Sequence, residues 1–116
     1  MVSRRGGGSP EGFLPLKPRV FLMLLVLAQE PRHGYALKEE LADRGIVLGP
    51  GTLYRTLHRL LGDGLIAECD DRPSAGEDDE RRRYYQVTPL GRRVASAEAQ
   101  RLAALVEAAR AEGLIA

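Results

Sequence analysis

The residues with the most suggestive chemistry in this sequence lie between positions 50 and 61, where basic and apolar side chains repeat at helical spacing. At about 100° per residue, four leucines fall on one side of such a helix: Leu53, Leu57, Leu60 and Leu61. The other side carries hydroxyl and cationic groups: Thr52, Arg55, His58 and Arg59. A helix divided in this way can anchor one face in a core and present the other to a DNA groove, although a plain surface helix shows the same division.

Individual side chains of this helix and of the segment before it suit different contacts with DNA. We expect Arg55 and Arg59 to contact bases or phosphates, because a guanidinium can bridge O6 and N7 of guanine. His58 is a secondary candidate. Hydroxyl and amine groups suit phosphate oxygens, and the candidates are Thr52, Tyr54, Tyr35 and Lys38. For Tyr54 and Tyr35, a position at the edge of the core fits the pattern equally well.

Composition narrows the class of protein. The 116 residues, of which 44% are hydrophobic and 28% charged, suit a single domain. The single cysteine, Cys69, excludes an internal disulfide, and the N-terminus is not of the secretory type, so we expect a cytoplasmic protein. The longest apolar run, residues 20–28, has nine residues. Because roughly 20 are needed to cross a membrane, no membrane partner is expected.

Groups that support catalysis or bind cofactors are not combined in any arrangement typical of an enzyme. The sequence offers no nucleophile paired with a base, no carboxylate pair in an apolar setting and no glycine-rich phosphate loop between a strand and a helix. His33 and His58 are too distant in sequence to be presumed a metal-binding pair. We therefore expect neither an enzyme nor a bound cofactor or metal.

The formal net charge of +1 hides an uneven distribution. Residues 68–80 carry seven acidic side chains and one arginine, whereas residues 1–67 and 81–116 each have an excess of cationic side chains. The local surface, not the total charge, meets DNA. The low net charge therefore does not oppose nucleic-acid binding.

The N-terminal half of the sequence predicts an arm followed by two helices. Residues 1–18 are rich in glycine and proline and are expected to form a flexible arm. Residues 19–29 are apolar almost all round, which predicts a central helix. A second helix should run from Tyr35 to about Arg44, because Gly45 can then end it.

The next segment predicts strands on either side of the basic helix. Residues 46–48 are expected to form a short strand, and Thr52 is expected to cap the helix that follows. Residues 65–69 and 83–87 have the composition of two hairpin strands, joined by an acidic loop. We therefore expect one domain over residues 19–87.

A long helix is predicted over residues 88–113. Thr88 and Pro89 form a strong start signal, because a hydroxyl cap precedes proline at the first helical position. The apolar stripe of this helix is too long for so small a core to cover, so we expect a second copy of the chain to cover it. With two residues of the central helix, the expected dimer contacts are Phe21, Leu25, Val94, Leu102, Leu105, Val106 and Ala109.

Four motifs follow one another along the chain: His33-Gly34-Tyr35, Gly51-Thr52-Leu53-Tyr54 with Leu57 and Leu60, Gly64-Leu65-Ile66, and the run at 83–92 that begins Arg-Tyr-Tyr-Gln-Val-Thr-Pro. Each is weak alone, but their joint order and spacing are fairly specific. In these motifs the chain resembles the PadR-like transcriptional regulators. The resemblance covers roughly residues 20–95.

The resemblance implies a winged helix-turn-helix, mainly α with a small β-ribbon, followed by a long C-terminal dimerisation helix. It also implies a homodimeric regulator, usually a repressor, that reads an inverted-repeat operator in double-stranded DNA. The third helix would enter the major groove, and the wing would lie against the backbone or minor groove. A small hydrophobic effector held between the helices of the dimer is a further implication, although an aromatic content of 5% gives ring stacking less support.

The sequence also departs from the family pattern. Many relatives carry proline at the position of Arg55 and an acidic residue at that of Leu61, so the surface facing the groove is more basic here. Phosphates would repel the acidic run at 77–80, so we expect the tip of the wing to point away from DNA. The wing contacts would then be Arg81, Arg82 and Arg83. The alternative function is a winged helix that makes protein contacts alone, for which these arginines would be dispensable.

Overall fold

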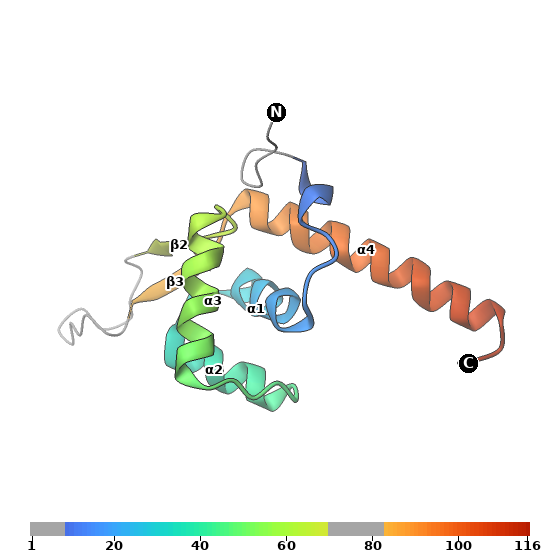
Figure 1. Ribbon diagram of the computed structural model, residues 1–116, viewed down its shortest axis with the longest axis horizontal. Helices are drawn as coiled ribbons and strands as arrows, with labels where there is room; N and C mark the ends of the chain where they lie inside the picture. Colours follow the sequence, from blue (N-terminus) through green and yellow to red (C-terminus); the bar gives the residue numbers. More distant parts are fainter. Residues whose placement is uncertain (1–8, 70–82) are drawn as a thin grey trace.

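The structure is a computed structural model that describes residues 9–69 and 83–116 (Figure 1). Within these ranges the chain forms α1 (Pro18–Gln29), β1 (Arg32–His33), α2 (Gly34–Asp43), α3 (Pro50–Gly62), β2 (Ile66–Cys69), β3 (Tyr84–Val87) and α4 (Pro89–Ala111), preceded by a short 3-10 helix, η2 (Pro10–Phe13). No helix in the described ranges is both long and apolar enough to cross a membrane.

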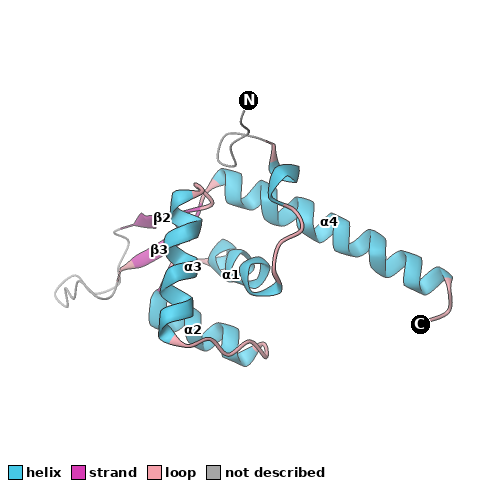
Figure 2. Cartoon of the chain, viewed as in Figure 1, coloured by secondary structure: helices cyan, strands magenta, loops and turns pink. Residues whose placement is uncertain are grey.

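Helix α1 lies at the centre of the core, as its apolar sequence predicts. Met23, Leu24 and Val26 are completely buried. Helices α2 and α4 and strand β3 all pack against α1, which lies between α3 and α4 in the view of Figure 2. Each of these buried side chains contributes about 1.5–3 kcal/mol relative to an exposed one. The leucine face of α3, the helix predicted to face DNA, belongs to the same buried core.

The three strands form one antiparallel sheet in the order β1-β3-β2. β2 and β3 make the expected hairpin, with Ile66 opposite Val87. The second edge of β3 is occupied by β1, where Arg32 lies opposite Tyr85. The predicted two-stranded ribbon is thus the larger part of a three-stranded sheet.

The short strand predicted at residues 46–48 was wrong. These residues form no strand, and Val47 is 81% exposed. Gly45 adopts a positive φ of 90°, and the Ile46 N–H donates to the carbonyl of Leu41 at 2.9 Å, which closes the end of α2. Residues 46–48 therefore connect α2 to α3, and the strand that pairs with the free edge of β3 is formed by Arg32 and His33.

The cap predicted at Thr52 was also wrong. Helix α3 begins two residues earlier, at Pro50, with Gly49 as its N-cap and no side-chain cap. Proline at the first helical position has no N–H to satisfy, so it lets the helix begin there. Thr52 instead lies within the first turn of α3, where its carbonyl accepts a hydrogen bond from the hydroxyl of Thr56 at 2.8 Å.

The described part of the N-terminal segment packs against α4, in contrast to the flexible arm expected over residues 1–18. Phe13 is only 5% exposed, and η2 lies against α4. The backbone N–H of Leu16 bonds to the carboxylate of Glu98, which Arg101 also contacts at 2.7 Å. These contacts, Arg101 first, hold the pKa of Glu98 below its usual value. Residues 9–17 therefore belong to the folded body.

Helix α4 begins at the predicted signal and then leaves the body of the protein. The Thr88 hydroxyl accepts from the Gly91 N–H at 3.0 Å, and Val94 and Ala95 pack into the core. Farther along, Leu105 and Val106 are 55% and 43% exposed. Figure 1 shows this half of α4 projecting as a rod beyond the other elements.

Candidate nucleic-acid interface

Helix α3 has the two faces that its sequence predicts. Leu53, Leu57 and Leu60 are 1–3% exposed and anchor the helix in the core. On the opposite side, Arg55, His58 and Arg59 are exposed to solvent. Burial of the leucines fixes the helix rotation, so these three side chains must face outward.

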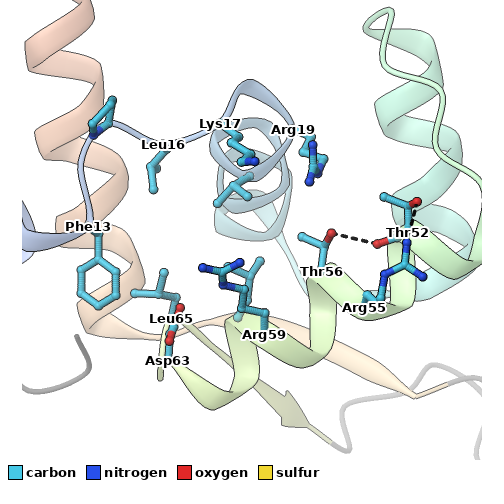
Figure 3. A pocket seen from close by; sticks show the side chains of 13 residues that line it. Phe13, Leu16, Lys17, Arg19, Thr52, Arg55, Thr56, Arg59, Asp63 and Leu65 are labelled. Carbon is cyan, nitrogen blue, oxygen red and sulfur yellow. Dashed lines mark hydrogen bonds between the residues drawn. The ribbon is translucent and has the colours of Figure 1, made fainter. Parts of the chain in front are cut away.

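Local bonds further order the outward face. The Arg55 guanidinium donates to the Thr52 hydroxyl at 3.2 Å, so the two side chains lie together on the first turns of α3. Arg59 carries no ion pair within the described residues and faces a hollow between α3 and the start of α1 (Figure 3). The chemistry available here is that of hydrogen-bond donors and positive charge, which suits phosphates and guanine edges.

The start of α2 lies beside this helix and adds further polar groups. Tyr54 is 45% exposed, and its ring lies over Gly34 at the start of α2; a Cβ built on Gly34 would come within 2.6 Å of the Tyr54 hydroxyl. The ring is therefore both a core-edge group and a surface group. Tyr35, which follows Gly34 in α2, is 61% exposed, and Lys38, one helical turn after Tyr35, is half-buried.

His33 joins α2 to the base of the wing, a role that the sequence did not reveal. Its Nδ1 accepts from the Ala36 N–H at 3.2 Å and so caps α2. Its ring stacks on that of Tyr35, with 6.5 Å between the ring centroids, and meets the ring of Tyr84 of β3 edge-on, with 5.5 Å between the centroids. The only sequence signal for this role is a polar residue directly before a helix, and histidine is not among the preferred caps.

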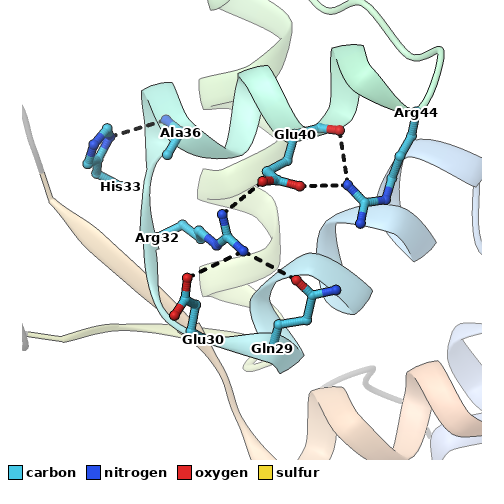
Figure 4. A network of polar contacts seen from close by, with 7 residues as sticks. All are labelled: Gln29, Glu30, Arg32, His33, Ala36, Glu40 and Arg44. Carbon is cyan, nitrogen blue, oxygen red and sulfur yellow. Dashed lines mark hydrogen bonds and ion pairs between the residues drawn. The ribbon is translucent and has the colours of Figure 1, made fainter.

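A polar network fixes the other side of α2 (Figure 4). The Glu40 carboxylate accepts from Arg44 at 2.7 Å and from Arg32 of β1 at 3.0 Å. These bonds, that of Arg44 first, hold the pKa of Glu40 below its usual value even though partial burial opposes them. Arg32 also donates to the Gln29 side chain at the end of α1 at 3.2 Å, so these bonds link β1, α2 and α1 beside the backbone that carries Tyr35 and Lys38.

The wing is described only at its base. Arg83 is exposed, but its guanidinium pairs with Glu68 across the hairpin at 3.0 Å. Tyr85 is 6% exposed, and burial raises the pKa of its hydroxyl. Arg81, Arg82 and the acidic run at 77–80 lie outside the described residues. A DNA contact by Arg83 would therefore have to compete with Glu68.

The predicted dimer residues fall into two groups. Leu25, Leu105 and Val106 are 37–55% exposed, and three others are half-buried: Phe21, Leu102 and Ala109. Val94 is completely buried within its own protomer, so its place among the expected contacts was wrong. It belongs to the first half of α4, which this chain itself covers. No cluster of three or more potential metal ligands occurs among the described residues.

Comparison with known proteins agrees with this geometry. A model of the family described as the transcriptional regulator PadR-like family matches residues 23–97. The Mycobacterium tuberculosis transcriptional regulator Rv3488 is 45% identical over 60 residues, which are 52% of this chain and 52% of that protein. This chain therefore matches about half the length of that relative.

Solved structures show the same fold. The crystal structure of a PadR family transcriptional regulator from Eggerthella lenta is 34% identical, covers 85% of this chain and 80% of its own, and has a TM-score of 0.64. A PadR family regulator from Clostridium difficile, 23% identical, covers 81% of this chain and 96% of its own with a TM-score of 0.69, which shows the fold alone. The expected winged helix-turn-helix is thus confirmed, and the family is one of regulators rather than enzymes. With the family match over residues 23–97, the chain belongs to the PadR-like family of transcriptional regulators.

Proposed function

We propose that this protein is a DNA-binding transcriptional regulator whose α3 enters the major groove. The observation that carries the proposal is the division of α3, with three leucines at 1–3% exposure opposite the exposed Arg55, His58 and Arg59. Arg55 and Arg59 would contact bases or phosphates, and His58, Thr52 and Tyr54 would add weaker contacts. Tyr35, Lys38 and the wing arginines would contact the backbone beside them.

We further propose that the working form is a homodimer joined through α4. The free half of this helix exposes Leu105 and Val106 next to the half-buried Leu102 and Ala109. A second copy could cover this stripe and would repeat α3 at a fixed distance. Such a dimer would read an inverted repeat in double-stranded DNA. Repression in the cytoplasm, relieved by a small hydrophobic effector, completes the proposal.

Selection of bound fragments from a genomic DNA library, followed by titration over a range of salt concentrations, tests this function. We expect enrichment of an inverted repeat and an affinity that falls steeply with log[salt]. Arg55→Gln and Arg59→Gln should each lower the affinity for DNA. The loss of a phosphate contact should reduce the slope of log K against log[salt] by about 1.8 per dimer. The loss of a base contact should cost about 1–3 kcal/mol at one base position. Arg93→Gln, at an exposed position on α4, is the matched control.

The contrary outcome is equally specific. If no sequence is enriched and binding to random fragments is unchanged in the Arg55 and Arg59 variants, the winged helix does not read DNA. The protein would then act through protein contacts alone.

A further inference from the structure

A hollow of about 470 Å³ lies between α3 and the start of α1 (Figure 3). Its apolar lining comes from both sides and includes Phe13, Leu16, Val20, Leu60 and Leu65. A volume of this size is within the range of small-molecule sites, which are about 300–1,000 Å³ and mostly apolar with a few placed polar groups. The hollow is thus large enough for an organic ligand.

The polar groups of the hollow are mainly cationic. Lys17 is the N-cap residue of α1, Arg19 lies in its first turn, and Arg55 and Arg59 come from α3. Asp63 is the one carboxylate among the described residues of the lining. Figure 3 shows Arg59 rising from α3 toward the side on which Lys17 and Arg19 lie. The start of α1 adds the positive end of a helix dipole. An anion would be attracted to this hollow more strongly than to a neutral surface.

These cations also lack the carboxylate partners that most arginines have elsewhere in the described chain. None of the four forms an ion pair there, whereas five of the seven described arginines outside the hollow do. Among the described residues, the Nε of Arg19 is a buried donor with no hydrogen-bond partner, as is the Nε of Arg32 outside the hollow. A buried donor without an acceptor is destabilising. An anionic ligand in the hollow would offer the Arg19 guanidinium an acceptor.

We propose that the hollow binds an organic anion with an apolar body, such as an alkyl carboxylate or alkyl phosphate. The anionic head would lie against Arg19, Lys17 and Arg59, and the apolar body would lie along Leu16, Val20 and Leu65. This site is within one protomer, between its N-terminal segment and α3. It is distinct from the cleft between the α4 helices of a dimer.

A regulatory consequence follows, and this part rests on the proposed function. Arg55 and Arg59 belong both to the hollow and to the face of α3 that would contact DNA. A bound anion would neutralise charge that phosphates require, so anion and DNA would weaken each other's binding by the same factor.

Anion binding is tested on the DNA-free protein by titration calorimetry. Octanoate and octyl phosphate are the probes, and their relative affinities distinguish the two head groups. Octan-1-ol, which lacks the charge, and inorganic phosphate, which lacks the apolar body, should bind at least tenfold more weakly. Arg19→Gln should weaken octanoate or octyl phosphate binding about tenfold, the loss expected for one charge-assisted hydrogen bond. Arg93→Gln should not, and equal melting temperatures would show that both variants fold.

The outcomes separate this site from the proposed function. Anion binding that Arg19→Gln weakens supports the site even if the protein never binds DNA. The site is refuted if neither octyl anion binds, if both bind the Arg19 variant as tightly as the parent, or if inorganic phosphate binds as tightly as octyl phosphate. It is also refuted if Arg19→Gln weakens DNA binding while no anion binds, because the hollow would then hold a DNA phosphate.

Discussion

The first turn of α4 lies so close to the chain before β2 that only glycine fits at position 91. A Cβ on Gly91 would be 2.1 Å from the Leu65 carbonyl oxygen and 2.7 Å from the nearest Val87 methyl carbon. That carbonyl cannot move freely, because it accepts from the Thr88 N–H at 3.1 Å. Overpacking of this kind costs about 1–3 kcal/mol or more, while alanine gains about 1 kcal/mol over glycine in a helix. Because the obstacle is backbone, we expect Gly91→Ala to lower the free energy of unfolding by about 2 kcal/mol.

Thermal unfolding followed by circular dichroism measures this effect, with all proteins at one concentration because a dimer's melting temperature depends on it. At about 4 °C per kcal/mol, Gly91→Ala should melt about 8 °C below the parent. Gly62→Ala is the matched control: Gly62 ends α3, and a Cβ on it would have no neighbouring atom within 4 Å, so the melting temperature of this variant should stay level or rise slightly. A Gly91 variant that melts within about 2 °C of the parent would show that the junction yields and that the steric reasoning is wrong.

Two further predictions concern α4. The pKa of Glu98 is held below its usual 4.5, so the ionised carboxylate should stabilise the fold fully above that pH, and this stabilisation should be lost as the pH falls through the lower folded-state pKa. The urea concentration at the midpoint of unfolding should therefore fall less steeply with acidification in Glu98→Gln than in the parent. Parallel curves for the two proteins would contradict the assignment. Leu105→Asp should shift the protein from dimer to monomer in sedimentation, because a charge would be buried in the proposed interface. Ala104→Asp, at an exposed position on the opposite side of α4, should leave the oligomeric state unchanged, and a stable dimer in the Leu105 variant would argue against the α4 interface.

The elements predicted correctly are those whose signals are local. The two faces of α3 follow from leucines at helical spacing, and the start of α4 follows from a hydroxyl cap followed by proline at positions 88 and 89. In both cases the residues that determine the structure are neighbours in sequence. Tertiary contacts then agree with the local preference rather than override it.

The elements that were missed depend on distant contacts. β1 has only two residues, Arg32 and His33, and becomes a strand because β3 offers an open edge. Phe13 is surrounded by glycine and proline in sequence and becomes buried because η2 meets α4. The apolar stripe of α4 predicts one continuous surface, but its pattern could not show that Val94 is covered by this chain while Leu105 is left open.

The contact between Gly91 and Leu65 also bears on the kind of operator that a dimer of this protein could recognise. Thr88 bonds to both Gly64 and Gly91, so α4 continues from β3 without a hinge. Two protomers joined through such rods would have little freedom to change the distance between their α3 helices. One inserted base pair moves a half-site by about 3.4 Å along the duplex and turns it by about 35°, so a single insertion at the centre of the repeat should abolish simultaneous binding of both halves.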